Sequence, residues 1–436
     1  MAVLIVSKSN SLDGCVIVPG DKSISHRAVI IGSLAQGETR IANFLASADC
    51  LKTIDCVRKL GIEISCQDGI ITVYGRGLAG LREPRDMLDV GNSGTTIRLM
   101  SGLLAGQPFG SFITGDESIR SRPMDRVTKP LKQMGAAVIG RKQDSLAPLA
   151  IRGGNLEPIS YCTEVASAQV KSAILIAGLF ADGWTEVTEP AVSRNHTELM
   201  LQGFGVPVIT DGLSVRVKGR QTMYGCDIQV PGDMSTAAFL IAAATIVPDS
   251  KLVLKNVGLN PSRTGIIDVL QEMGGNITID NKQMKMGELV GDITVETARL
   301  SGIKVAGDLV VRLIDEIPIL AVAAAFAEGV TEIRDAAELR VKESNRIAVM
   351  VNEFSKLGID ITELPDGLRI KGGRPLTGAV CSSHGDHRIA LSLAVAGLMA
   401  EGKTSIMQAE STAVSFPNFN QVLAEIGVDW SVVNSD

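Results

Sequence analysis

Aromatic residues make up only 3% of this 436-residue chain, and its net charge is -6. The shortage of aromatic rings argues against a surface that stacks nucleic-acid bases. The negative balance argues against a binder of the nucleic-acid backbone, which usually presents a basic face. We therefore expect no nucleic-acid partner, and local clusters of Lys and Arg would have to bind any anionic ligand.

The chain also lacks a long hydrophobic run. Its longest apolar stretch, Ile317–Ala327, is too short to cross a bilayer, so no membrane partner is predicted. The first residues, Met1–Val6, carry no basic leader and are typical of a strand. Because no Cys-x-x-Cys pair is present, we predict a cytoplasmic protein whose cysteines are reduced and mostly buried. These cysteines are Cys15, Cys50, Cys56, Cys66, Cys162, Cys226 and Cys381.

Histidine is scarce as well, with four residues in the whole chain. His384 and His387 flank a Gly-Asp pair in a spacing that suggests a metal ligand set, but no further Cys or His cluster supports it. Neither a G-x-x-x-x-G-K-[ST] loop nor a convincing nucleophile elbow is present. The sequence therefore predicts no metal centre.

What the sequence does contain is a repeat. A helical stretch that ends in a bulky residue plus Gly, and is followed by an apolar alternating run, recurs roughly every 70 residues. Gly in the left-handed conformation commonly ends a helix in this way. The six copies are Leu60-Gly61, Met134-Gly135, Phe204-Gly205, Met273-Gly274, Leu357-Gly358 and Ile426-Gly427.

A polar residue that can cap a helix precedes an Ala- and Leu-rich helix in each repeat. These predicted helix starts lie near Ser23, Asn92, Ser167, Ser235, Asp315 and Asp386. In the first helix Ile24, Ala28, Ile31 and Ala35 fall on one face, which predicts a half-buried helix. The chain thus reads as an α/β protein of six units, and repetition alone leaves its function open, a structural scaffold included.

The two halves of the chain echo each other. Pro19-Gly20-Asp21-Lys22-Ser23 recurs as Pro231-Gly232-Asp233-Met234-Ser235, so we predict two domains of three units. Their bounds are 19–230 for the first, and 231–436 plus the strand 1–18 for the second. Lys22 stands where the second copy has Met234, and a cation at a helix start opposes the helix dipole unless an anion binds there. A solvated Lys on an exposed turn is the alternative interpretation.

Further cations and small polar residues lie near the other predicted helix starts. Their recurrence in several copies of one repeat favours an anion-binding site, although solvated surface positions explain most cations of an acidic protein. The residues are Arg27, Asn92, Gly94, Arg98, Arg120, Arg122, Arg126, Gln169, Lys171, Arg194, Lys342, Arg346 and Arg388.

Carboxylates accompany these cations. Asp315-Glu316 opens the fifth-repeat helix, and Glu343 lies between Lys342 and Arg346. An N-cap and an i,i+3 surface pair would explain them structurally. Held among cations, the same groups could transfer protons in a polyanionic site.

Taken together, these segments resemble the enolpyruvyl transferases, and within them the branch that acts on a phosphorylated shikimate. The resemblance spans nearly the whole chain. Its seven ordered motifs are PGDKSISHRA (19–28), GNSGTTIRLM (91–100), Arg122-Pro123, SAQVKSA (167–173), DEIP (315–318), RVKESNR (340–346) and DHRIA (386–390). The family fold has two domains, each of three βαβαββ units arranged as an inside-out α/β barrel, with the active site in the interdomain cleft.

The resemblance implies transfer of enolpyruvate from phosphoenolpyruvate to the 5-hydroxyl of shikimate 3-phosphate. It implies that shikimate 3-phosphate is held by Lys22, Ser23, Arg27, Ser167, Gln169, Arg194, Asp315 and Lys342. It implies that phosphoenolpyruvate is held by Lys22, Asn92, Gly94, Arg122, Gln169, Arg346 and Arg388. The implied catalytic groups are Asp315, Glu343 and Lys22, without a cofactor, in a monomer that glyphosate inhibits.

Two positions depart from the family pattern. Val414 stands where many members carry a Lys, and Glu338 where some carry an amide. The competing family reading is the sister enzyme that uses UDP-N-acetylglucosamine, which typically has a reactive Cys before its Arg-Pro step. Here that loop, Gly115-Asp116-Glu117-Ser118, contains no Cys. A non-catalytic scaffold or nucleic-acid-binding protein built on the same repeat is the remote alternative.

Overall fold

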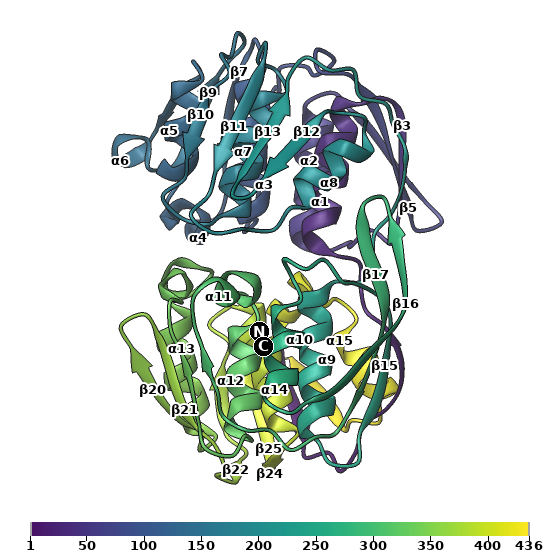
Figure 1. Cartoon of the computed structure of the whole chain (residues 1–436), viewed down its shortest axis with the longest axis vertical. Coiled ribbons are helices and arrows are strands. Elements are labelled where there is room, and N and C mark those ends of the chain that lie inside the picture. Colours follow the sequence, from purple (N-terminus) through teal and green to yellow (C-terminus); the bar gives the residue numbers. More distant parts are fainter. Residues whose placement is uncertain (1, 435–436) are drawn as a thin grey trace. The chain divides into compact units, whose positions relative to one another are not determined.

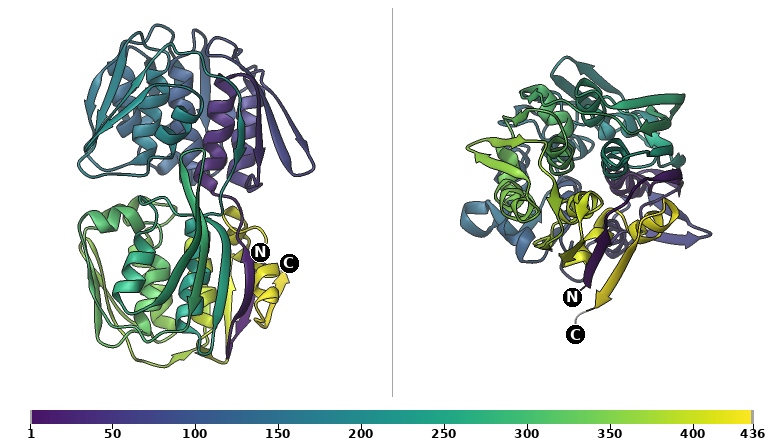
Figure 2. Two further views of the ribbon diagram at one scale, coloured as in Figure 1. Left: turned by 45° about the vertical axis from the view of Figure 1, so that its right-hand side comes forward. Right: turned by 90° about the horizontal axis from the view of Figure 1, so that it is seen from below.

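A computed structural model describes residues 2–434, and their contacts divide the chain into two compact units. Unit 1 contains the residues up to Pro19, Pro231–Met284 and those from Leu289 on, while unit 2 contains Gly20–Val230 and Lys285–Glu288. Pro19 thus groups with unit 1. The short segment Lys285–Glu288 groups with unit 2, although no sequence pattern indicated it. Figures 1 and 2 show that both units are layered from helices and strands.

Unit 2 is built on three four-stranded sheets within the described residues. In each, the first two strands pair in parallel and the remaining pairs are antiparallel. The orders are β14 (Asp227–Gln229), β3 (Gln36–Ala42), β5 (Ile70–Arg76), β4 (Glu63–Gln67); β6 (Leu88–Asp89), β7 (Gly110–Thr114), β9 (Leu146–Arg152), β8 (Ala137–Gly140); and β10 (Ser160–Cys162), β11 (Trp184–Thr188), β13 (Ser214–Lys218), β12 (Val208–Asp211).

Unit 1 also has three four-stranded sheets over the part of the chain that the structure describes. Its four-stranded sheets are β16 (Asn276–Lys285), β17 (Glu288–Glu296), β15 (Lys251–Gly258), β2 (Asp13–Ile17); β18 (Lys304–Val305), β19 (Val330–Ile333), β21 (Gly367–Lys371), β20 (Asp360–Leu364); and β23 (Val380–Ser382), β25 (Lys403–Met407), β1 (Ala2–Ser7), β26 (Trp430–Asn434). In each, the parallel pair lies at one end of the order, namely β15 with β2, β18 with β19 and β23 with β25. A small pair, β22 (Leu376–Thr377) and β24 (Ala400–Glu401), accompanies them. The α/β class predicted from the repeats is confirmed, and β1 lies where the first strand was predicted, with Met1 outside the described residues.

Three long helices form the interior of each unit. They are α1 (Lys22–Leu34), α3 (Gly94–Ala105) and α7 (Ala168–Gly178) in unit 2, and α9 (Met234–Ile246), α12 (Ile317–Ala325) and α14 (His387–Gly397) in unit 1. Every residue of α9 and α12 is buried, as expected for helices that are apolar all round. The half-buried first helix is a wrong prediction, because the run Ile24–Leu34 of α1 is buried on all sides among its neighbours.

Shorter helices complete both units. In unit 2 they are α2 (Ala48–Lys59), α4 (Glu117–Ser121), α5 (Asp125–Gln133), α6 (Arg141–Asp144) and α8 (His196–Gly203). In unit 1 they are α10 (Gly265–Glu272), α11 (Asp308–Leu313), α13 (Arg346–Lys356), α15 (Phe419–Glu425) and the 3-10 turns η1 (Ala337–Val341) and η2 (Ala409–Val414). Each unit has its own hydrophobic core.

The chain crosses between the units after β2 and again after β14, and each of these strands pairs within the unit that the chain is leaving. β2 directly precedes α1 of unit 2 but pairs with β15 of unit 1, with Val16 opposite Leu254. β14 directly precedes α9 of unit 1 but pairs with β3 of unit 2. The crossing at Gly20 requires glycine, because a Cβ there would lie 1.9 Å from the Asn43 carbonyl oxygen. Each crossing therefore leads straight into an interior helix.

The predicted helix ends are confirmed. Gly61, Gly135, Gly205, Gly274, Gly358 and Gly427 all have positive φ and follow a helix C-cap. Among the starts, Ser167 and Asp386 are the N-caps of α7 and α14. The other four caps are Asp21, Ser93, Asp233 and Glu316, displaced by a residue or two from the predicted positions.

The prediction that most cysteines are buried is wrong. All seven are free thiols, but only Cys50, Cys56 and Cys381 are buried. Cys15 on β2 and Cys66 on β4 are exposed, because alternate side chains of a strand point away from the core. Across residues 2–434 we find no helix with the length and apolarity that crossing a membrane requires.

Candidate functional site

The start of α1 brings three predicted site residues together. The Lys22 ammonium pairs with the Asp49 carboxylate of α2, and the Lys22 side chain is 19% exposed. Arg27, one turn further on, is buried; its Nη1 donates to the Ser23 carbonyl (2.9 Å) and its Nε to the Thr197 hydroxyl of α8 (2.7 Å). These oxygens hold the guanidinium in a fixed orientation. This helix start therefore presents oriented cations.

His26, between these cations, cannot serve as a proton shuttle at neutral pH. Burial, together with the charge of Lys22, lowers its pKa to about 3. Its Nδ1 is 2.7 Å from the Thr53 hydroxyl, which is in turn 2.7 Å from the Thr96 hydroxyl. His26 is thus a neutral core residue that ties α1 to α2 and α3.

A second group of predicted residues lies at the start of α3. The Asn92 Oδ1 accepts from Arg122 Nη2 (2.9 Å), and its Nδ2 donates to Asp116 (2.6 Å). The Ser118 hydroxyl also accepts from Arg122, at 3.0 Å. Arg122 is only 7% exposed. The Asn92 amide and the Ser118 hydroxyl therefore orient the Arg122 guanidinium, and Asp116 in turn holds Asn92.

Gly94 and Gln169 border the same arginines. A Cβ on Gly94 would lie 2.9 Å from Arg98 Nη1 and 3.0 Å from Arg122 Nη1, so both guanidinium groups converge on this glycine. The Gln169 Oε1 accepts from Arg98 Nη1 (2.7 Å), and its Nε2 donates to the Thr95 hydroxyl (2.9 Å). The starts of α3 and α7 are thereby linked.

Ser167 and Arg194 complete the predicted residues of unit 2. The Ser167 hydroxyl accepts from the backbone N–H of Val170 (3.4 Å) and so caps α7. Arg194 follows Ser193 in the loop before α8 and is half-buried. Both segments lie against Glu189, which no functional pattern in the sequence indicated.

In unit 1 the predicted residues gather around Arg346, a guanidinium that is 1% exposed. Its Nε donates to Asp386 (2.8 Å), its Nη1 to Asp315 (3.3 Å) and its Nη2 to Glu343 (2.5 Å). Burial alone would lower the pKa of Arg346, but the charges of Asp386, Glu343 and Asp315 outweigh burial and raise the pKa above its ordinary value. Arg346 is therefore a permanent cation.

Asp315 is surrounded by cations. Lys342 Nζ is 3.3 Å from its Oδ1, and Arg388 Nη2 is 3.9 Å from its Oδ2. Arg388 Nη1 also donates to the Asp315 carbonyl (3.0 Å) and to Glu316 (3.4 Å). The side chain of Asp315 is 14% exposed and that of Glu343 is 26% exposed, so solutes can reach both carboxylates.

Asp386 anchors this cluster, a role that sequence reasoning missed because its helix cap was a sufficient explanation. It is fully buried, which by itself raises the pKa of the carboxyl group, but the charges of Arg346 and His387 together with the hydrogen bond from Arg346 leave the pKa below its ordinary value. Asp386 also accepts from the Ser344 hydroxyl (3.1 Å) and caps α14. The same residue thus starts the helix and fixes the central guanidinium.

The predicted site residues therefore lie at the starts of α1 and α3 and beside Glu189 in unit 2, and around Arg346 in unit 1. Those of unit 2 are Lys22, Ser23, Arg27, Asn92, Gly94, Arg122, Ser167, Gln169 and Arg194, and those of unit 1 are Asp315, Lys342, Glu343, Arg346 and Arg388. Some supporting contacts join residues distant in sequence, since Arg27 donates to Thr197 and, through Nη2 at 2.8 Å, to Ser172, and no local pattern marks such pairings.

Other polar positions lie outside these groups. Lys171, one of the cations noted near helix starts, is turned into the core of unit 2 between two carboxylates. His384 pairs with Glu353 (3.0 Å), which accounts for one end of the suspected metal ligand set. Among the described residues no three His, Cys, Asp or Glu side chains are grouped as metal ligands. Val414, the position of the missing Lys, ends η2.

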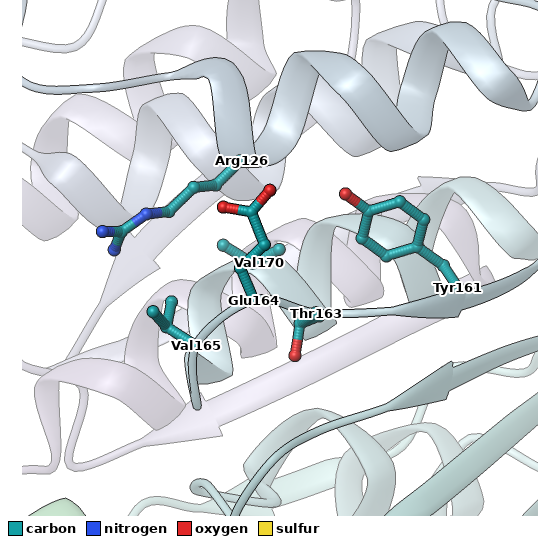
Figure 3. A pocket seen from close by; sticks show the side chains of 6 residues that line it. All are labelled: Arg126, Tyr161, Thr163, Glu164, Val165 and Val170. Carbon is teal, nitrogen blue, oxygen red and sulfur yellow. The ribbon is translucent and has the colours of Figure 1, made fainter.

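A small hollow beside α5 and α7 is lined by Arg126, Tyr161, Thr163, Glu164, Val165 and Val170 (Figure 3). It encloses about 10 Å³, roughly the space of a single water molecule, so it is not a substrate site. A wider hollow of about 310 Å³ lies by Leu34, Arg76 and Arg220, at the opposite end of α1 from Lys22.

Comparisons with known proteins identify the family. Residues 6–423 match the family of EPSP synthase (3-phosphoshikimate 1-carboxyvinyltransferase). The chain is 56% identical over 427 residues to the 3-phosphoshikimate 1-carboxyvinyltransferase of Desulforamulus reducens, covering 98% of this chain and 100% of the relative. It is 58% identical over 428 residues to the one from Pelotomaculum thermopropionicum, covering 98% and 99%.

Solved structures agree with this match. An EPSP synthase from Acinetobacter baumannii is similar with a TM-score of 0.89 at 42% identity, over 100% of both chains. The enolpyruvyl transferase NikO from Streptomyces tendae shares the fold, with a TM-score of 0.81 at 17% identity over 100% and 99% of the chains. The predicted enolpyruvyl transferase fold of two three-unit domains is thereby confirmed, and this chain belongs to the EPSP synthase family.

Proposed function

We propose that this chain transfers the enolpyruvyl group of phosphoenolpyruvate to the 5-hydroxyl of shikimate 3-phosphate and releases inorganic phosphate. This reaction belongs to aromatic amino-acid biosynthesis. Near-full-length relatives that carry the name 3-phosphoshikimate 1-carboxyvinyltransferase support the assignment. The observation that carries it is the unit 1 cluster, where Asp315 and Glu343 are held by Arg346 beside Lys342 and Arg388.

The polar residues of unit 2 suit a phosphorylated polyol. Oriented cations and hydroxyls at helix starts bind phosphate well, because helix N-termini add free N–H groups and positive potential. We assign shikimate 3-phosphate to Lys22, Ser23, Arg27, Ser167, Gln169, Arg194, Asp315 and Lys342. We assign phosphoenolpyruvate to Lys22, Asn92, Gly94, Arg122, Gln169, Arg346 and Arg388.

The chemistry is addition followed by elimination. In the addition, the 5-hydroxyl oxygen bonds to C2 of phosphoenolpyruvate, the hydroxyl proton leaves to a base, and C3 takes up a proton from an acid. In the elimination, the bond from C2 to the phosphate oxygen breaks, C3 loses a proton and the double bond re-forms. The route needs an acid/base pair and strong stabilisation of negative charge, but no covalent nucleophile.

The cluster supplies these groups. Glu343 exchanges the proton at C3, since it is one of the two exposed carboxylates and Arg346 fixes its orientation. Asp315 orients the 5-hydroxyl and accepts its proton, with Lys342 and Arg388 stabilising the carboxylate. Lys22 assists the proton transfers and the departure of phosphate. No step uses a cofactor.

Phosphate release from shikimate 3-phosphate plus phosphoenolpyruvate tests this proposal. Glu343→Gln keeps the shape but can exchange no proton, so we expect a rate loss of about 100- to 10,000-fold. Glu332→Gln is the control, because Glu332 forms a surface pair with Arg334 in the same unit (3.0 Å). Turnover only with UDP-N-acetylglucosamine as acceptor would overturn the assignment.

Four further properties are part of the proposal. Glyphosate should compete with phosphoenolpyruvate, because Gly94 has no side chain to obstruct the site where the Arg98 and Arg122 guanidinium groups converge. The protein should be cytoplasmic. It should also be a monomer, which sedimentation across a range of concentrations would check. Retention on a heparin column should be weak, as expected for a chain of net charge -6.

A further inference from the structure

The loop that carries Arg194 rests on a buried cluster of three charges to which the reaction assigns no role. Lys171 lies on the first turns of α7, with its Nζ 2.7 Å from Glu189 Oε2 and 2.8 Å from Glu198 Oε1. The side chains of Lys171, Glu189 and Glu198 are only 4%, 3% and 6% exposed. The Lys171 ammonium contacts two carboxylates of its own unit, so its function is sought in what those two partners hold.

Glu189 holds two backbone segments at once. Its Oε1 accepts from the N–H of Ser167 (3.2 Å), the cap of α7. Its Oε2 accepts from the N–H of Ser193 (3.4 Å), the residue before Arg194. One carboxylate therefore sets the spacing between two segments to which we assign shikimate 3-phosphate contacts.

Glu198 connects the cluster to a third segment. It lies on α8 beside Thr197, whose hydroxyl is 2.6 Å from the Ser172 hydroxyl and accepts from Arg27 Nε at 2.7 Å. Ser172 follows Lys171 on α7, so neighbouring residues of α7 bind neighbouring residues of α8. Figure 1 shows α8 beside α1, the helix that carries Arg27.

Charge explains why the cluster needs its lysine. Burying a carboxylate is costly unless a cation pairs with it. Two carboxylates close to an anion site would also repel the anion. Lys171 lowers both costs, because it offsets one of the two negative charges and pairs with Glu189 and Glu198 while remaining away from solvent.

We propose that Lys171, Glu189 and Glu198 are positioning residues that hold Ser167, the Arg194 loop and Arg27 at the spacing of shikimate 3-phosphate. They touch no substrate themselves. The identity of the ligand rests on the proposed function, whereas the positioning of the segments does not.

Glu189→Gln tests the proposal by kinetics. An amide keeps a single acceptor oxygen, so it cannot accept from Lys171, Ser167 and Ser193 together. Hydrogen bonds to a charged group are strong, so we expect the KM for shikimate 3-phosphate to rise at least about tenfold. kcat and the KM for phosphoenolpyruvate should change much less. An unchanged KM for shikimate 3-phosphate would overturn the proposal.

Glu186→Gln is the matched control, because Glu186 lies on the same strand region, three positions before Glu189, and is only half-buried. Its kinetic constants should equal those of the wild type. Lys171→Arg keeps the charge and should retain most of the affinity. Lys171→Met leaves two buried carboxylates without their cation and should fold poorly. The triple variant Lys171→Met/Glu189→Gln/Glu198→Gln removes all three charges and should fold again with the KM defect retained.

Hydrogen–deuterium exchange without substrate gives an independent readout. The backbone amides of Ser167 and Ser193 should exchange faster in Glu189→Gln than in Glu186→Gln or the wild type. Equal exchange at both amides would overturn the proposal whatever the kinetics show. If the wild-type enzyme released no phosphate from shikimate 3-phosphate, the proposed function would fail, yet exchange would still decide whether Glu189 positions these segments.

Discussion

The starts of α1 and α9 carry almost the same sequence but present different surfaces. In both, an Asp caps the helix: Asp21 accepts from the Ile24 N–H at 2.8 Å, and Asp233 accepts from the Ser235 N–H at 2.7 Å. The next residue is the partly exposed Lys22 in α1 and the fully buried Met234 in α9.

The partners of the two helix starts differ as well. Ser235 is buried; it donates to Glu316 and accepts from Arg263 Nη2 at 2.7 Å. Arg263 also pairs with Asp233 at 2.8 Å. Ser235, the counterpart of Ser23, is therefore bonded to side chains of its own unit. Met234, the counterpart of Lys22, offers no charge at all. The comparison teaches that the second copy of the motif is enclosed by the fold, whereas the first keeps a partly exposed cation, which suits the ligand contact proposed for it.

The largest expected effect comes from making the copies alike. Lys22→Met gives α1 the residue that α9 carries, so phosphate release should fall about 1,000-fold, the size expected when a charged transition-state contact is lost. It also removes the cation that pairs with Asp49, so some stability should be lost while the fold persists. Steady-state kinetics and circular dichroism would check both parts. Lys52→Met is the control, since it removes an exposed lysine that pairs with Asp89. Near-normal turnover in Lys22→Met would show that the cation is dispensable.

The reciprocal change should act on stability instead. Met234→Lys places an ammonium at a position that is 1% exposed, and desolvation should cost about 3 kcal/mol or more in the free energy of unfolding. Urea unfolding measures this loss. Met284→Lys, at a side chain that is 64% exposed in the same unit, should leave the midpoint unchanged. Equal midpoints for the two variants would contradict the assignment of α9 to the fold.

A pH dependence further distinguishes α1 from α9, because α1 buries a histidine and α9 contains none. Folding lowers the pKa of His26 from 6.5 to about 3, so the unfolded chain takes up a proton first as the pH falls. Stability is then full above pH 6.5 and decreases by about 1.4 kcal/mol per pH unit toward pH 3. Unfolding free energies measured between pH 6 and 4 should fall less steeply in His26→Gln. Parallel slopes for the two proteins would refute this prediction.

The smallest expected effect concerns Gly94. A Cβ there would press on the ends of Arg98 and Arg122, which can shift, so Gly94→Ala should fold normally. Displacing Arg122 should raise the KM for phosphoenolpyruvate and the inhibition constant for glyphosate, each by about tenfold. Gly102→Ala on the same helix is the contrast, because its Cβ would lie 2.1 Å from the Ala173 carbonyl oxygen and should destabilise the fold. An unchanged KM in Gly94→Ala would separate this glycine from the substrate.

Local signals explain what could be predicted from the sequence. Six helices end at a position with positive φ, which glycine adopts most readily, so the recurring glycine marks each helix end in the sequence. Part of the cluster around Arg346 can be predicted from the sequence because Lys342, Glu343 and Arg346 are neighbours along the chain. Motif resemblance then joined them to Asp315 and Arg388.

Long-range pairing explains what could not be predicted. Lys171 looked like a donor at a helix start, but its environment is set by Glu189 and Glu198 on other elements. In the same way, the apolar residues on one face of α1 do not indicate that neighbouring elements also cover its remaining faces. Burial of this kind depends on packing between repeats, which no single repeat encodes.

The order in which the chain builds its two units has a consequence for circular permutation of the protein. Unit 2 is almost entirely one uninterrupted stretch, inserted into unit 1 between Pro19 and Pro231. Ala2 of β1 pairs with Asn434 of β26, so the chain ends are close enough to be joined by a short linker. Joining them and opening the chain at Pro231 would turn an interrupted module into two consecutive ones. Such a circular permutant would carry unit 1 first and unit 2 second, each encoded without a break apart from the hairpin tip Lys285–Glu288.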